Sequence, residues 1–206
     1  MIKSTKPFSR SLRTLTHVPR WSIVRLIQRQ SVMEHQGLVA IYADQIADII
    51  GWDGDRRSLL MAALSHDWTE VETGDMPGPF KKSVVDGGKL DDFEREVYER
   101  RFGGEPRITD DPMVHYILKT ADMLEAVLFL VSERRLGNHG VTGVLLTSYA
   151  LLVRTLDNYT LEQRTRVLVA IHEALRDEWR GQDGIPNRDL ESQGYRLQDI
   201  LKGLEG

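Results

Sequence analysis

Apolar residues recur at intervals of three and four positions along most of this chain, and no stretch alternates apolar and polar residues long enough to predict a strand. Residues 32–50 show this spacing, and it returns over residues 111–128, 144–150 and 161–179. Such spacing places the apolar side chains on one face of a helix. The sequence therefore predicts an all-α fold.

Residues that begin and end helices support this reading. Gly51 ends the first predicted helix, and Asp55 caps the next one, which runs to about residue 64. Asp111 and Pro112 begin the longest predicted helix. Two further helices are expected over residues 89–101 and, more weakly, 188–204, whereas the glycines and prolines of residues 73–79 predict a structured loop.

Length and composition indicate one domain. With 206 residues, 41% of them hydrophobic, the chain can bury one core, with a motif-bearing part at about 20–135 and C-terminal helices 139–204 packed on it. A net charge of −4 argues against nucleic acid or an anionic membrane as a partner. Residues 126–131, one of the longest apolar runs, are too few to span a membrane. We expect a cytoplasmic protein.

The absence of cysteine leaves histidine, aspartate and glutamate as the strong metal ligands. His35 lies early in one predicted helix, the pair His66-Asp67 ends the next, and Asp122 lies within a third. Two imidazoles and two carboxylates suit a divalent ion, whether Zn, Mn, Co, Mg or Fe. An adjacent His-Asp pair cannot share one helix face, but it can supply two ligands where a helix ends. On spacing alone, a core histidine and a chance dipeptide remain alternatives.

The surrounding residues resemble a known family. From His66 to Lys81 the chain reads HDWTEVETGDMPGPFK, which resembles the HDxxE and TGDxPxPxK signature of HD-domain nucleotidases. Residues 20–21 (RW), 31–35 (SVMEH) and 119–122 (KTAD) are similar to further elements of that family, in the same order. The resemblance extends to about residue 125, and it points to bacterial 5′-deoxynucleotidases and phage dATP triphosphohydrolases. If the chain is phage-encoded, the expected compartment is the cytoplasm of the host.

The resemblance implies an all-α, single-domain HD helical bundle with a role for each motif residue. One divalent metal ion would be bound by His35, His66, Asp67 and Asp122. Glu70 would position or deprotonate the attacking water. The deoxynucleotide substrate would be bound by Arg20, Trp21, Ile23, Asp75, Pro77, Pro79, Lys81 and Lys119.

Each role has a plainer alternative. Trp21 could be a core aromatic residue, Asp75 could merely cap the turn at Gly74, and Lys81 with Lys82 could be a solvated pair.

The resemblance favours dATP as substrate, with deoxyadenosine and triphosphate as products. The pattern of residues 20–23 is more similar to the phage enzymes, and a triphosphate could use the basic residues Arg20, Arg25, Arg29, Lys81, Lys82 and Lys119. The alternative enzyme is a dNMP 5′-nucleotidase that releases orthophosphate. A non-catalytic nucleotide sensor would not require Glu70, and a helical interaction domain is the plainest alternative.

We also expect a homo-oligomer, a dimer or higher. The segment 145–153 carries more apolar residues than one core face requires, namely Leu145, Leu146, Tyr149, Leu152 and Val153.

Overall fold

The computed structural model describes residues 10–83, 87–102 and 111–180. Within these ranges the chain is helical and contains no strand, apart from one isolated bridge between Pro19 and Ser31. The α-helices are α1 (Val32–Ile49), α2 (Arg56–Ser65), α3 (Glu70–Thr73), α4 (Gly78–Ser83), α5 (Gly87–Phe102), α6 (Pro112–Arg135), α7 (Thr142–Thr155) and α8 (Leu161–Arg180). Short 3-10 helices lie at η1 (Arg10–Thr16), η2 (His139–Val141) and η3 (Leu156–Asn158). The all-α prediction is confirmed.

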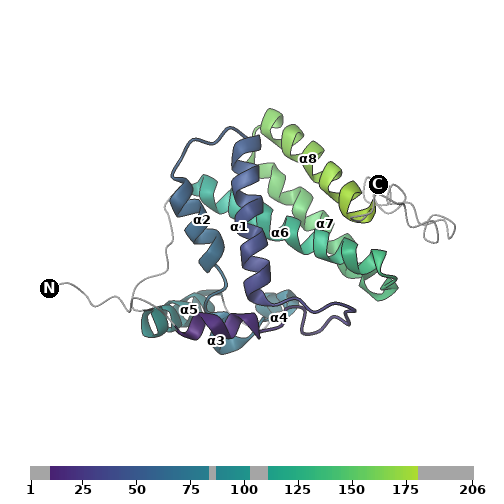
Figure 1. Ribbon diagram of the computed structural model, residues 1–206. Helices are drawn as coiled ribbons and strands as arrows, with labels where there is room; N and C mark the ends of the chain where they lie inside the picture. The colour runs from purple at the N-terminus through teal and green to yellow at the C-terminus, as the bar shows by residue number, and fades with distance from the viewer. Residues whose placement is uncertain (1–9, 84–86, 103–110, 181–206) are drawn as a thin grey trace.

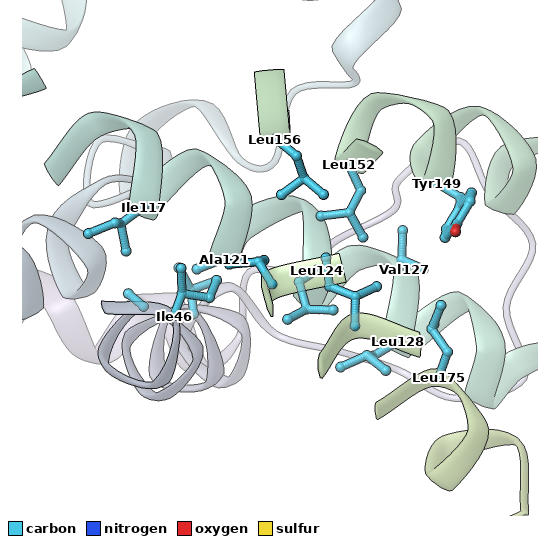
Figure 2. Close-up of a cluster of buried hydrophobic side chains, with 14 of the residues drawn as sticks. Ile46, Ile117, Ala121, Leu124, Val127, Leu128, Tyr149, Leu152, Leu156 and Leu175 are labelled. Atoms are coloured by element: carbon cyan, nitrogen blue, oxygen red, sulfur yellow. The ribbon is translucent and has the colours of Figure 1, made fainter. Parts of the chain in front are cut away.

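The core forms around α6, which packs against α1, α7 and α8 (Figure 1). Helices α6 and α7 form an antiparallel pair joined through η2. Figure 2 shows Leu152 and Leu156 of α7 and η3 over Ala121 and Leu124 of α6. The helices α3, α4 and α5 gather at the end of the bundle where α1 begins (Figure 1).

The helix ends follow local chemistry. Gly51 takes a φ of 69° after α1, a left-handed conformation that glycine adopts without strain. The Asp111 side chain accepts a hydrogen bond from the Met113 amide, and Pro112 fills the first turn of α6, as predicted.

Several elements differ from the sequence-based expectation: α7 is longer than residues 144–150, and α3, η2 and η3 were not expected. Helix α6 continues to Arg135, well past residue 128, because its apolar positions continue to Val131 and two arginines favour its C-terminal end. Helix α4 begins inside the predicted loop, at Gly78, and η1 was not expected. The expected helix over residues 188–204 lies outside the described residues.

A buried carboxylate holds the segment between η1 and α1 against the bundle. The side chain of Glu133, on α6, accepts hydrogen bonds from the Ile27 amide at 2.8 Å and the Gln28 amide at 2.7 Å. Asn138 donates a further hydrogen bond to it at 2.7 Å. None of the helices described is long and apolar enough to cross a bilayer.

Candidate active site

Three helices bring His35, His66 and Asp122 together. His35 lies in the first turn of α1, His66 caps the C-terminal end of α2, and Asp122 lies in α6. Each offers one ligand atom, and these atoms all lie within 4.8 Å of one another. The chain therefore contains a group that could hold a divalent metal ion, as predicted.

The imidazoles present free ring nitrogens to this group. Nδ1 of His66 lies 2.7 Å from the Ala63 carbonyl oxygen, which can only accept, so Nδ1 carries the proton. Nδ1 of His35 contacts the Glu125 carboxylate, and the Arg20 guanidinium lies 2.5 Å from the same nitrogen. The two Nε2 atoms are buried and make no hydrogen bond to any described residue. Because an orphaned buried nitrogen is costly, two of them aimed at one point fit a metal site.

The carboxylates of Asp67 and Asp122 face these nitrogens. One Asp122 oxygen lies 3.4 Å from Nε2 of His35. One Asp67 oxygen lies 3.2 Å from Nε2 of His66 and 3.8 Å from Nε2 of His35. Ligand atoms that each lie about 2 Å from one ion are separated by roughly 3 Å or a little more. Asp67 is therefore near enough to join the group, although it is not one of the three residues that cluster most tightly.

Without a metal, these groups stabilise one another's charges. Burial opposes the charged form of His66, but the Asp67 carboxylate outweighs this effect and the pKa of His66 rises to about 9. Burial likewise opposes ionisation of Asp67, and the His66 imidazolium nevertheless holds the pKa of Asp67 well below its usual range. The two carboxylates therefore favour positive charge at this point, which a divalent ion would supply.

Glu125, on α6, fixes the orientation of His35. Besides contacting Nδ1, it accepts hydrogen bonds from Arg20 at 2.9 Å and Gln30 at 2.5 Å. This carboxylate was missed by the sequence analysis. Its signal was available, because Glu125 is a charged residue within the apolar run of α6 and follows Asp122 by one turn.

Glu70 lies beside the metal-binding group with one free oxygen. Its side chain is buried, Oε1 lies 3.5 Å from the Lys81 ammonium, and Oε2 has no hydrogen-bond partner in the described structure. Burial and the nearby Asp67 carboxylate raise the pKa of Glu70 to about 8. A carboxyl group that exchanges its proton near neutral pH suits general acid–base catalysis.

A cavity of about 640 Å³ opens over these residues. Among the residues predicted to bind metal, water or substrate, its lining includes Arg20, Trp21, Ile23, Asp67, Glu70, Asp75, Pro77, Lys81, Lys119 and Asp122. His35 and His66 do not line it. The side chain of Pro79 lies outside the described residues.

Trp21 is held in a strained conformation. Its φ is 65°, which costs a bulky residue on the order of 1–3 kcal/mol. The Asp75 carboxylate accepts a hydrogen bond from the Trp21 amide at 2.7 Å, and the indole stacks on Phe129 with ring centres 6.0 Å apart. Asp75 thus does more than cap the turn at Gly74, since it fixes the backbone of a residue that lines the cavity.

Helix α7 forms a wall that sequence reasoning missed. Val144, Ser148, Leu151, Arg154 and Thr155 line the cavity, followed by Asn158 in η3. These residues lie beyond the motifs, so only the packing of α7 on α6 reveals them. Arg25 and Arg29 are exposed and do not line the cavity, and the side chain of Lys82 lies outside the described residues.

Comparisons of the sequence with known proteins give matches to enzymes that act on deoxynucleotides. The model of the YfbR-like 5′-deoxynucleotidase family matches residues 7–86. A 5′-deoxynucleotidase from Vibrio cholerae is 29% identical over 139 residues, which cover 59% of this chain and 72% of that protein. A dATP triphosphohydrolase from Acinetobacter phage SH-Ab 15497 is 31% identical over 145 residues, which cover 59% of this chain and 66% of that protein.

Solved structures share the fold. The cyanophage S-2L HD phosphohydrolase DatZ, solved with dA and one catalytic Zn²⁺ ion, superposes with a TM-score of 0.68 at 24% identity, over 81% of this chain and 95% of that one. An HD-domain phosphohydrolase from Listeria innocua gives a TM-score of 0.65 at 20% identity and covers 95% of both chains. These likenesses confirm the predicted helical bundle.

Proposed function

Because this chain is an HD-domain phosphohydrolase related to YfbR-like 5′-deoxynucleotidases and phage dATP triphosphohydrolases, we propose that it hydrolyses a phosphate ester of a deoxynucleotide. The favoured reaction converts dATP and water into deoxyadenosine and triphosphate. One observation carries the proposal: the buried, unpartnered Nε2 atoms of His35 and His66 face two carboxylates beside the free oxygen of Glu70.

The metal site is part of this proposal. His35, His66, Asp67 and Asp122 would hold one divalent ion, with Glu125 orienting His35 from behind. When bound, such an ion supplies an activated water and polarises a phosphoryl oxygen. Two imidazoles with two carboxylates suit Zn, Co, Mn, Mg and Fe alike, so the ligand set does not select among them.

The side chains of the cavity would divide the remaining work. Glu70 takes the proton of the attacking water as the water oxygen bonds to the α-phosphorus. The bond between that phosphorus and O5′ then breaks, and O5′ takes up the proton that Glu70 received, directly or through water, and leaves as the hydroxyl of deoxyadenosine. Arg20, Lys81 and Lys119 hold phosphate oxygens and stabilise their charge. The nucleoside lies against Trp21, Ile23, Asp75, Pro77 and Pro79.

A dNMP 5′-nucleotidase is the second candidate. The relative from Vibrio cholerae carries that activity in its name, and the family model that matches residues 7–86 is a 5′-deoxynucleotidase model. In that case the same groups would act on a single phosphate and release orthophosphate.

Incubation with each dNTP and dNMP separates these candidates. The protein is supplied with one divalent metal at a time, and the products are separated by chromatography. We expect loss of dATP with formation of deoxyadenosine, and no reaction once the metal is chelated. Hydrolysis of dNMPs alone would select the second candidate, and hydrolysis of no deoxynucleotide under any metal would refute the proposal.

Two further expectations remain proposals. A deoxynucleotide hydrolase would meet its substrate in the cytoplasm. For the homo-oligomer, Leu145, Tyr149 and Leu152 are buried in the chain's own core and are therefore not free to form an interface. Ile27 and Ile41 are exposed to 58% and 53%, do not line the cavity, and are better candidates. Sedimentation at micromolar concentration should give a mass above the 23.5 kDa of one chain, whereas a monomer mass would contradict it.

A further inference from the structure

The surface that α6 presents to the cavity changes from cationic to apolar along the helix. Lys119 comes first, Asp122 of the metal-binding group follows one turn later, and Met123 and Ala126 come last. With a rise of about 1.5 Å per residue, Lys119 and Ala126 lie roughly 10 Å apart along the axis. The metal-binding group thus has a cation on one side and apolar side chains on the other.

Helix α7 reinforces this polarity because it runs antiparallel to α6. The Thr120 hydroxyl donates a hydrogen bond to the Thr155 hydroxyl at 2.9 Å, which fixes the register of the two helices. Arg154 therefore lies at the end of the cavity that holds Lys119. Val144, at the start of α7, lies at the apolar end.

Arg154 differs from the other cations that line the described cavity. Three of them face a carboxylate: Arg20 faces Glu125 at 2.9 Å, Lys81 faces Glu70 at 3.5 Å and Lys119 faces Asp122 at 2.8 Å. The exposed guanidinium of Arg154 has no carboxylate partner among the residues that the structure describes. Its charge is available to a ligand.

We propose that Arg154, with Lys119, forms a subsite for the β- and γ-phosphates of a nucleoside triphosphate. This inference rests on the proposed function, since it takes the α-phosphate to lie at the metal-binding group. The nucleoside then occupies the apolar end, and the outer phosphates extend toward Arg154. Lys119 becomes available as well once a metal ion takes Asp122. A guanidinium fits phosphate oxygens with two parallel hydrogen bonds, so Arg154 separates triphosphates from monophosphates.

Equilibrium binding to full-length protein tests the subsite without relying on turnover. The Glu70→Gln variant serves as background, so that nucleotide is not consumed, and dATP and dAMP are titrated in the presence of the metal. Arg154→Gln added to this background should weaken the binding of dATP roughly tenfold or more, because it removes a charge-assisted hydrogen bond. It should change dAMP affinity less than twofold. Arg154→Lys should keep part of the dATP affinity.

Arg166→Gln is the matched control. It removes the same charge from an exposed arginine of α8 that pairs with Glu162, and it should leave both affinities unchanged. Suppose that the wild-type protein hydrolyses deoxynucleotides but Arg154→Gln weakens the binding of dATP and dAMP equally, or changes the binding of neither. The proposed subsite is then refuted while the proposed function stands. If the wild-type protein hydrolyses no deoxynucleotide and Arg154→Gln still weakens dATP selectively, the subsite stands and the proposed function fails. If Arg154 only stabilises α7, Arg154→Gln would lower the melting temperature and change neither affinity.

Discussion

Asp122 contacts both the metal-binding group and Lys119, one of the basic residues proposed to bind the substrate. It lies 3.4 Å from Nε2 of His35 and 2.8 Å from the Lys119 ammonium. Asp122→Asn should lower metal affinity by more than about a hundredfold, since changes even behind the ligands cost 10–100-fold. Metal content after dialysis gives the measurement, and circular dichroism should show an unchanged helical fold. Asp157→Asn, on an exposed aspartate that pairs with Arg164, is the control and should keep its metal.

Glu70 is assigned to the proton of the attacking water. Glu70→Gln should lower turnover roughly 10²–10⁴-fold with metal content unchanged, which is the usual size of general acid–base help. Glu72→Gln removes an equal charge two residues away, where Glu72 pairs with Arg100 and Arg101, and should keep most of the activity. Equal loss in both variants would contradict the assignment.

The same residue predicts a pH dependence in the metal-free protein. The pKa of Glu70 is raised from 4.5 to about 8, so the folded chain holds a proton that the unfolded chain releases. The stability that this proton contributes is complete below pH 4.5 and is lost as pH rises through 8. In chelator, the melting temperature of the wild type should therefore fall relative to Glu70→Gln between these values. Parallel curves would show that Glu70 titrates normally. His66 adds to the dependence in both proteins alike.

At the scale of elements, the Glu133 carboxylate of α6 holds part of the segment that carries Trp21. Glu133→Ala leaves the amides of Ile27 and Gln28 without this acceptor, and should destabilise the fold by about 1.5–3 kcal/mol, the usual size for a hydrogen bond to a charged group. A loosened segment should also raise KM for dATP more than it lowers kcat, because Trp21 lies remote from the bond that breaks. Denaturant unfolding and steady-state kinetics measure the two effects. Glu162→Ala, on the exposed face of α8, should change neither.

Sequence periodicity predicted the long helices α1, α6 and α8, because each of them buries apolar residues at helical spacing. Periodicity and end signals could not predict α4, because its first residues, Gly78 and Pro79, are as common in a loop as at the start of a helix. The end of α6 also ran past the expectation. Helix ends are decided by a few local contacts, which a periodic pattern does not contain.

For the whole molecule, the motifs led to the residues that line the cavity from one side. The motifs did not identify Glu125 as the support of His35, although its charge within the apolar run of α6 marked the residue. They did not identify Arg154 as part of the α7 wall either, because both roles depend on which helices pack together. The roles of the predicted ligands and substrate-binding residues stay predictions, and their placement around one cavity is what the fold adds.

The central claim is that water attacks the α-phosphorus of dATP at this site. The most direct test is hydrolysis of dATP in ¹⁸O-labelled water with a divalent metal present. The masses of both products are then measured by mass spectrometry. The account predicts unlabelled deoxyadenosine and intact triphosphate that carries one ¹⁸O atom. Label in the 5′-hydroxyl of deoxyadenosine, release of dAMP with diphosphate, or unreacted dATP would contradict it.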